Sequence, residues 1–239
     1  MKLYFDLETI PGTAAHLRQE AEDSTRPSAA IKKPETLAKW HEEERPAAVA
    51  ATFHKFGLAP ETGEIVSIAA VTDDDVEFVQ CRAPGESEAE LLAAFFAWVA
   101  ECQASRVQVL TDGAGHAWPM EPAPVHLVAH NAGFDVPYLR NRCIALGIKP
   151  SFRLPGGLDR AGKHFTCTML EWAGYGGKVS LRRLALALGL PDPKGGMEGS
   201  QVYDAWQAGH VEAIAAYNLS DARMVKAISE RMAAVEVAA

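Results

Sequence analysis

The stretch Lys2-Leu3-Tyr4-Phe5-Asp6-Leu7-Glu8 alternates between two kinds of side chain and predicts the strand around which the fold is built. Successive side chains of a strand point to opposite faces, so Asp6 and Glu8 should share one face while Phe5 and Leu7 enter the core. One metal ion could then contact both carboxylates. Because the chain has 31 acidic residues, a solvated strand face would explain this pair equally well.

The length and composition predict a single globular domain. The chain has 239 residues, of which 48% are hydrophobic and 23% charged, values that are ordinary for a folded protein. We expect one domain over residues 1–239. Residues 14–58 are rich in Ala, Glu, Lys and Arg and contain three prolines, which predicts a helical insertion made of short helices.

The rest of the chain alternates between predicted strands and helices. Residues 63–71 and 76–79 should form a hairpin and residues 125–129 a further strand, whereas residues 111–124, with three prolines and two glycines, predict a surface loop. Helices are expected over residues 87–102, 135–146 and 180–188, and from about residue 211 into the C-terminal tail. This order of elements predicts an α/β fold with a mixed sheet.

Charge and cysteine usage narrow the functional classes. A net charge of −8 argues against a protein that coats duplex nucleic acid, although it does not exclude a nuclease whose carboxylates hold cations. The four cysteines are widely separated and predict neither a zinc site nor a disulfide framework. No apolar stretch is long enough for a signal peptide or a membrane span, so we expect a cytoplasmic protein.

Two further acidic residues lie where a site could form. Asp135 follows a predicted strand at the start of a helix, where open α/β sheets often bind ligands, although aspartate also favours this position as an ordinary helix cap. Tyr217 and Asp221 are four residues apart and should lie on one helix face. A packed tyrosine beside an exposed aspartate would give the same spacing.

Three motifs together resemble a known family. Phe5-Asp6-Leu7-Glu8-Thr9, His130-Asn131-Ala132-Gly133-Phe134-Asp135 and Tyr217-Asn218-Leu219-Ser220-Asp221 resemble, in this order, the exonuclease motifs of the DEDD superfamily. Because Tyr217 lies four residues before Asp221, the chain resembles the tyrosine subclass. Within it, residues 177–202 extend the resemblance to the predicted 3′-5′ exonucleases related to the proofreading domain of family B DNA polymerases. One departure is Thr166-Cys167-Thr168-Met169, where relatives are expected to carry an aspartate.

This resemblance implies a fold, a site and an activity. The fold would be RNase H-like, and Asp6, Glu8, Asp135 and Asp221 would hold two divalent cations, Mg²⁺ or Mn²⁺, with Tyr217 orienting the attacking water. Hard oxygen ligands suit those ions. The substrate would be the 3′ end of a nucleic acid, DNA rather than RNA and single-stranded, with a polymerase or repair protein as partner. The expected nucleic-acid-binding residues are Thr9, Asn131, Phe134 and Lys194.

Two other functions stay open on the sequence. A 3′-5′ exoribonuclease would use the same carboxylates, since recognition of a 2′-hydroxyl has no motif here. A non-catalytic nucleic-acid-binding or polymerase-associated subunit could keep the fold, but the presence of all five motif side chains argues against it.

Overall fold

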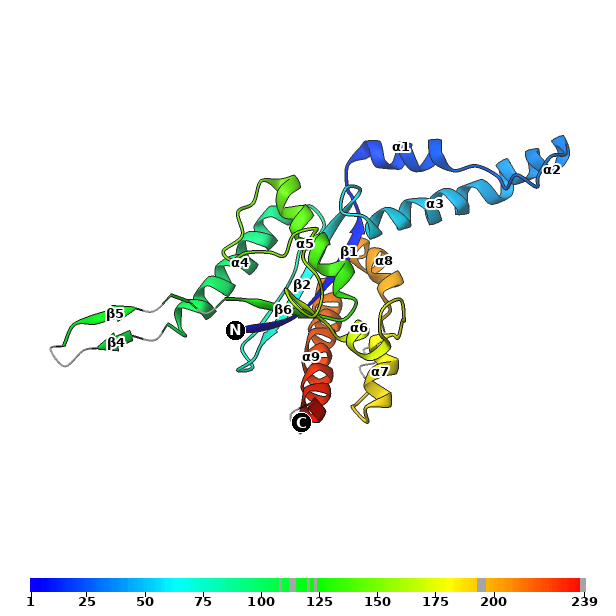
Figure 1. Cartoon of the computed structure of the whole chain (residues 1–239). Helices are drawn as coiled ribbons and strands as arrows, with labels where there is room; N and C mark the ends of the chain where they lie inside the picture. The colour runs from blue at the N-terminus through cyan, green and yellow to red at the C-terminus, as the bar shows by residue number, and fades with distance from the viewer. Residues whose placement is uncertain (108, 112–114, 120, 123, 193–196, 237–239) are drawn as a thin grey trace.

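A mixed five-stranded sheet forms the centre of the molecule (Figure 1). The computed structural model describes residues 1–107, 109–111, 115–119, 121–122, 124–192 and 197–236. The strands of the sheet, in spatial order, are β3 (Glu77–Cys81), β2 (Gly63–Thr72), β1 (Lys2–Pro11), β6 (His126–Ala129) and β7 (Thr166–Cys167). Strand β1 pairs antiparallel with β2 and parallel with β6, so the predicted mixed α/β sheet is confirmed.

Helices cover both faces of this sheet. The main hydrophobic core joins Leu3, Phe5 and Leu7 of β1 to helices α4 (Glu88–Ala104) and α5 (Ala132–Leu146). On the opposite face lies α9 (Val211–Glu236), which packs through Ala222 and Val225. The alternation of β1 therefore sends its odd-numbered side chains toward α4 and α5 and its even-numbered ones toward α9, as predicted.

A β-bulge interrupts the pairing of β1 with β2 beside the carboxylates. The register shifts between Glu8 and Thr9, because β2 contains one extra residue at that point. As a result Val66 and Ser67, although adjacent in sequence, both contact α9, Val66 through Ile214 and Ser67 through Asn218. Ser67 pairs directly with Glu8 and so shares its face, whereas the bulge adds Val66, the extra residue, to the same side of β2.

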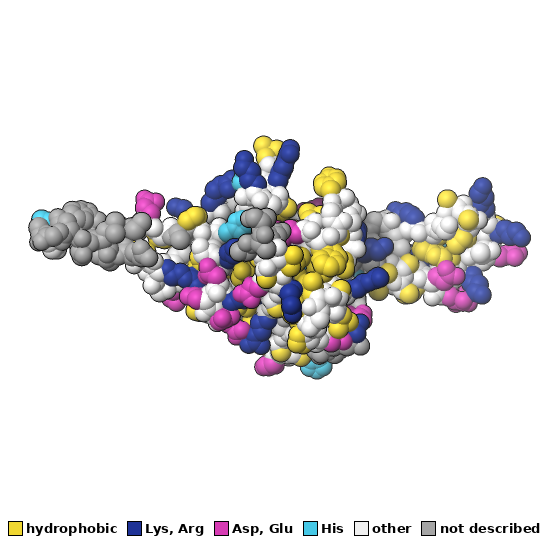
Figure 2. Space-filling model, turned by 60° about the horizontal axis from the view of Figure 1, so that its bottom comes forward, with side chains coloured by type: hydrophobic (Ala, Val, Ile, Leu, Met, Phe, Trp, Pro, Cys, Tyr) yellow, Lys and Arg dark blue, Asp and Glu magenta, His cyan; other side chains and the backbone are white. Residues whose placement is uncertain are grey.

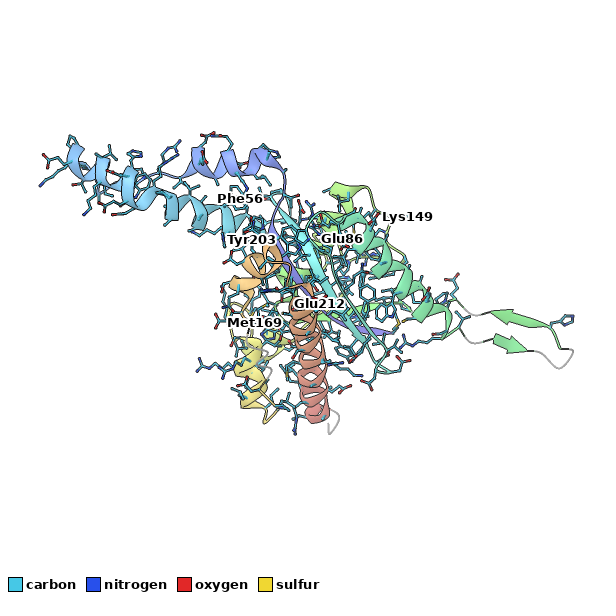
Figure 3. All side chains as sticks on the ribbon, turned by 180° about the vertical axis from the view of Figure 1, so that it is seen from behind. Phe56, Glu86, Lys149, Met169, Tyr203 and Glu212 are labelled. Carbon is cyan, nitrogen blue, oxygen red and sulfur yellow. The ribbon has the colours of Figure 1, made fainter. Side chains whose placement is uncertain are left out.

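Residues 14–58, referred to below as the insertion, contain mostly helices and project from the sheet as an arm (Figure 1). Its elements are α1 (Ala15–Ser24), α2 (Pro34–Lys39), a π-helical turn (Trp40–Glu44), α3 (Arg45–Lys55) and a 3₁₀ turn, η2 (Phe56–Leu58). Phe53 and Phe56 of the insertion and Tyr203 of α8 (Val202–Gln207) share a hydrophobic cluster where the arm returns to the body (Figure 3).

The remaining elements connect this framework. The predicted helices at 180–188 and 135–146 are present as α7 (Leu181–Ala187) and α5, each followed by a glycine with positive φ. The prediction of a loop over residues 111–124 is wrong in part, because β4 (Val109–Thr111) and β5 (Ala117–Pro119) pair there as a short ribbon. The additional short elements are α6 (Thr168–Ala173) and η3 (Gly199–Gln201). Of the helices that the structure describes, none is long and apolar enough to cross a membrane.

Candidate metal centre and substrate pocket

Three of the predicted carboxylates converge in the structure. Asp6 and Glu8 lie on the α9 face of β1, and Asp221 faces them from α9, with one carboxylate oxygen of each residue within 4.8 Å of the others. Glu8 is only 8% exposed, and the other two are partly buried. Residues more than 200 positions apart in the chain therefore form one compact group of oxygen ligands.

Asp135 joins this group from the start of α5. It is 4% exposed and accepts hydrogen bonds from its own backbone amide and from that of Leu7, which lies between Asp6 and Glu8 on β1. Its charge is felt by both neighbours on that strand, because it raises the pKa values of Asp6 and Glu8. Asp135 thus lies close enough to Asp6 and Glu8 for their charges to interact, although it is not one of the three residues whose oxygens lie within 4.8 Å of one another.

Burial raises the pKa of every carboxyl group in this cluster. Desolvation is the largest cause for all four, and mutual repulsion adds to it for Asp6 and Glu8, whose pKa values lie well above the usual range. The pKa of Asp135 is raised to about 8 and that of Asp221 to about 6. Among the described residues no lysine or arginine forms an ion pair with these four groups. Such a set of buried, uncompensated hard oxygens fits divalent cations such as Mg²⁺ or Mn²⁺.

Tyr217 lies one helical turn before Asp221 and shares a side-chain hydrogen bond with it. Desolvation and the nearby charges of Glu8 and Asp221 raise its pKa far above that of a free phenol. The hydroxyl therefore keeps its proton at neutral pH, and its role can only be that of a neutral hydrogen-bonding group.

A further residue of the site, Asn218, was not predicted from the sequence. Its side-chain amide donates to Asp6 Oδ2 at 2.8 Å and its Oδ1 accepts from the Ser67 hydroxyl at 2.9 Å, while the residue itself is fully buried. This bond holds the carboxylate of Asp6 in place across the β1–α9 interface. Asn218 lies inside the third motif, and the packing of α9 against the sheet gives it two partners there, Asp6 on β1 and Ser67 on β2.

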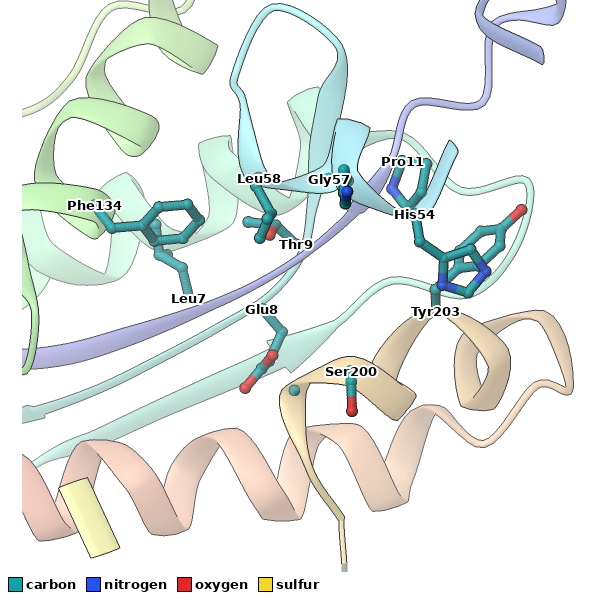
Figure 4. Close-up of a pocket in the computed structure, with 12 residues that line it drawn as sticks. Leu7, Glu8, Thr9, Pro11, His54, Gly57, Leu58, Phe134, Ser200 and Tyr203 are labelled. Carbon is teal, nitrogen blue, oxygen red and sulfur yellow. The ribbon is translucent and has the colours of Figure 1, made fainter. Parts of the chain in front are cut away.

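A pocket of about 420 Å³ opens beside Glu8 (Figure 4). The predicted nucleic-acid-binding residues Thr9 and Phe134 line it, together with Leu58, which is 65% exposed although apolar. The insertion contributes His54, Lys55 and Gly57 to the lining, and η3 and α8 contribute Ser200 and Tyr203. These residues were not predicted, because nothing in the sequence shows that the insertion folds back onto the site.

One buried hydroxyl fixes the insertion against this pocket. Tyr138, which follows Asp135 by three residues on α5, donates to the carbonyl of Gly57 at 3.0 Å and shares a side-chain hydrogen bond with Thr9. The same helix thus carries a carboxylate of the centre and positions the pocket wall formed by Leu58.

The other two residues predicted to bind nucleic acid, Asn131 and Lys194, are not among the described residues that line this pocket. Asn131 is exposed at the end of β6 with a φ of 60°, and it lines a second pocket, of about 450 Å³, rather than the one beside Glu8. Lys194 lies outside the residues that the structure describes.

Comparisons with known proteins found one matching family. Residues 118–225 match the family described as predicted 3′-5′ exonuclease related to the exonuclease domain of PolB; this segment includes Asp135, Tyr217 and Asp221, whereas Asp6 and Glu8 precede it. No curated protein matches the chain significantly.

Among solved structures, the chain is similar to the family B DNA polymerase from the hyperthermophilic archaeon Pyrobaculum calidifontis, with a TM-score of 0.56 and 18% sequence identity. The match covers 97% of this chain and 24% of the polymerase chain, so this protein spans about a quarter of that relative's length. The two comparisons confirm the predicted resemblance: residues 118–225 are similar to the predicted 3′-5′ exonucleases related to PolB, and the α/β fold is similar to part of a family B DNA polymerase.

Proposed function

We propose that the protein is a metal-dependent 3′-5′ exonuclease that hydrolyses the terminal phosphodiester of single-stranded DNA. The observation that carries this proposal is the group of Asp6, Glu8 and Asp221, with Asp135 beside it, which forms no ion pair with a lysine or arginine among the described residues; Glu8 of this group also lines a pocket of about 420 Å³. In this proposal, residues 1–239 act as one domain, and residues 14–58 are its helical insertion.

The four carboxylates would hold two divalent cations, Mg²⁺ or Mn²⁺. Bound divalent cations supply Lewis acidity, which assists both the attack of water on phosphorus and the departure of the 3′ oxygen. Water then adds its oxygen to phosphorus as the bond to the 3′ oxygen breaks, one proton passes to that oxygen, and a nucleoside 5′-monophosphate leaves. Asn218 and the backbone amide of Leu7 keep Asp6 and Asp135 in position during the reaction.

The pocket beside Glu8 would receive the terminal nucleotide. Phe134 and Leu58 offer apolar surfaces to a base, and the partly exposed position of both side chains leaves those surfaces accessible. Lys55 supplies a cation at the same pocket. The apolar walls explain why this side of the carboxylates suits a base, whereas the carboxylates themselves suit the phosphate through bound cations.

Replacement of Tyr217 by Phe should slow turnover by about 10-fold to 100-fold without abolishing it. The hydroxyl orients water and Asp221 but stays protonated, so its loss removes one hydrogen bond rather than the base or a metal ligand. The measurement is kcat on end-labelled single-stranded DNA across a pH series. If one ionisation disappears from the pH dependence of kcat in Tyr217→Phe, the hydroxyl titrates during the reaction, and this would contradict the role of a neutral phenol.

The proposal is tested with DNA and RNA strands of one sequence, labelled at the 5′ end. We expect a ladder that shortens from the 3′ end, faster on DNA than on RNA, with Mg²⁺ or Mn²⁺ and none with a chelator. A strand labelled at the 3′ end should release labelled mononucleotide first. Faster hydrolysis of RNA would show that the protein is an exoribonuclease. Binding of the strands without hydrolysis under every metal condition would show that it is a non-catalytic binding subunit.

The preference for DNA and a polymerase or repair partner follow only from the relation to PolB-type exonucleases. The cytoplasmic location stays a prediction from the sequence.

A further inference from the structure

Two exposed aromatic side chains stand close together in the chain, away from the hydrophobic core. Trp172, in the last turn of α6, is 50% exposed, and Tyr175, two residues after that helix, is fully exposed. Aromatic side chains are normally buried for much of their area, so their exposure here is a feature of the surface that needs an explanation. Nothing in the proposed metal centre uses either ring.

A glycine turn holds Tyr175 outward. Gly174 and Gly176, on either side of it, have φ values of +74° and +81°, and the amide of Gly177 donates to the carbonyl of Gly174 at 3.2 Å. A β-carbon at Gly177 would lie 2.3 Å from the carbonyl oxygen of Ala173, so a larger residue does not fit there. The backbone of this turn is therefore specified, and it presents the tyrosine ring to solvent.

Basic residues follow the two aromatic residues in the sequence. Residues 169–183 contain three basic residues and one acidic residue in a chain whose net charge is −8. Lys178 and Arg183 are exposed and line the second pocket, of about 450 Å³, together with Asn131 and Ser180. No ion pair within the described part of the chain uses either cation, whereas the neighbouring Arg182 is bound by both carboxylate oxygens of Asp192 at 2.9 Å. Hydrophobic and basic side chains adjoin on the face that comes forward in Figure 2.

His130 fastens this segment to the metal centre. Its Nε2 lies 2.8 Å from the carbonyl oxygen of Val179, and because a carbonyl only accepts, Nε2 carries the proton. Burial lowers the pKa of His130, so the ring is neutral, and Nδ1 accepts from the hydroxyl of Thr168 at 2.9 Å. His130 directly follows β6 and precedes the start of α5, which carries Asp135, so its two hydrogen bonds hold the aromatic and basic segment to the same stretch of chain as Asp135.

We infer that Trp172, Tyr175, Lys178 and Arg183 form a strand platform, a binding surface for the part of a single-stranded nucleic acid that lies upstream of the scissile bond. Rings that stack on bases, combined with cations that contact phosphates, are the two elements of sequence-tolerant recognition of single strands. The inference rests on the proposed exonuclease function. It extends that function by assigning the terminal nucleotide to the pocket beside Glu8 and the preceding nucleotides to this surface.

The positions of Phe134 and Asn131 support this division. Both belong to the segment that begins α5, yet Phe134 lines the apolar pocket and Asn131 lines the basic one, with Asp135 entering the carboxylate cluster. A strand whose terminal phosphodiester lies at the carboxylates can therefore extend into both pockets. The described residues that line the basic pocket include no carboxylate, so this pocket suits phosphates that are not cleaved.

The test compares a dinucleotide with an oligothymidylate of about 12 nucleotides, a length within the range that single-strand sites accommodate. For Trp172→Ala/Tyr175→Ala and for Lys178→Ala/Arg183→Ala, we expect the KM of the oligonucleotide to rise about 10-fold, with little change in its kcat. The second variant should also reduce the slope of log KM against log salt by about 0.7 for each phosphate that the protein no longer neutralises. Because a dinucleotide reaches only the metal centre and its pocket, its hydrolysis reports the folding of each variant.

Two controls separate these residues from their neighbours. Arg182→Ala removes a cation that is already paired with Asp192, so its salt slope should equal that of the wild type. Tyr175→Phe keeps the ring and should bind like the wild type. If the double variants match the wild type in KM and salt slope while the wild type is active, the strand platform is wrong and the exonuclease proposal stands.

If the wild type hydrolyses neither substrate, the proposed function fails instead. Fluorescence anisotropy of the labelled oligonucleotide with Ca²⁺ then decides the inference on its own. Weaker binding by the double variants supports the platform, and unchanged binding overturns it.

Discussion

Asp6→Ala and Asp221→Ala are each expected to lower kcat on single-stranded DNA by at least about 1,000-fold, which corresponds to about 4 kcal/mol of lost transition-state stabilisation. Each carboxylate lies in the group whose oxygens approach within 4.8 Å, so removal of either one leaves too few hard ligands to hold cations at the scissile phosphate. The measurement is single-turnover hydrolysis of end-labelled DNA with saturating Mg²⁺ or Mn²⁺.

The control is Glu212→Ala, which removes an exposed carboxylate from the first turn of the same helix, α9, and should leave the rate unchanged. Thermal unfolding with a chelator distinguishes loss of ligands from loss of fold, because removal of one buried, mutually repelling carboxylate should not destabilise the metal-free protein. An Asp6→Ala protein that retains wild-type turnover would contradict the two-cation proposal.

The central strand shows why so much of the fold could be predicted. Alternation along Leu3 to Glu8 is a local property of a strand with one apolar face, and the structure keeps both faces as predicted. The long helices were predictable for the same reason, because their ends depend on local contacts: the Ser87 side chain accepts from the Glu90 amide at the start of α4, and Gly147 ends α5 with a positive φ. The four carboxylates were predictable only as a set, through motifs in a known order.

The parts that were not predicted depend on contacts between distant segments. Asn218 becomes a partner of Asp6 and of Ser67 because α9 packs across the sheet, and this brings together residues that lie far apart in the sequence. The contribution of Leu58 to the pocket depends on the hydroxyl of Tyr138 holding the carbonyl of Gly57, a contact across 81 residues of chain. The ribbon of β4 and β5 was predicted as a loop because prolines and glycines occur both in loops and at the ends of short strands.

Replacement of Asp135 by Asn should raise the melting temperature of the metal-free protein at pH 8 by at least about 4 °C. Desolvation raises the pKa of this carboxyl to about 8 in the folded protein, from an ordinary value of 3.8. Between these two values the folded state retains a proton that the unfolded state has released, so the free energy of unfolding falls as pH rises through this window. A change of about 1–2 kcal/mol shifts the melting temperature of a protein of this size by several degrees.

The comparison is made with a chelator, at a series of pH values from about 5 to 9. The wild type should lose stability across this range, Asp135→Asn should lose less, and the exposed Glu212→Gln should follow the wild type. Added Mn²⁺ should reverse the loss in the wild type, because a cation that binds only the folded state compensates the repulsion among Asp6, Glu8 and Asp135. The same ion should stabilise Asp135→Asn much less, since that variant lacks a charged ligand. A wild type whose stability does not change with pH, together with an equal response of both proteins to Mn²⁺, would show that Asp135 is not part of a cation site.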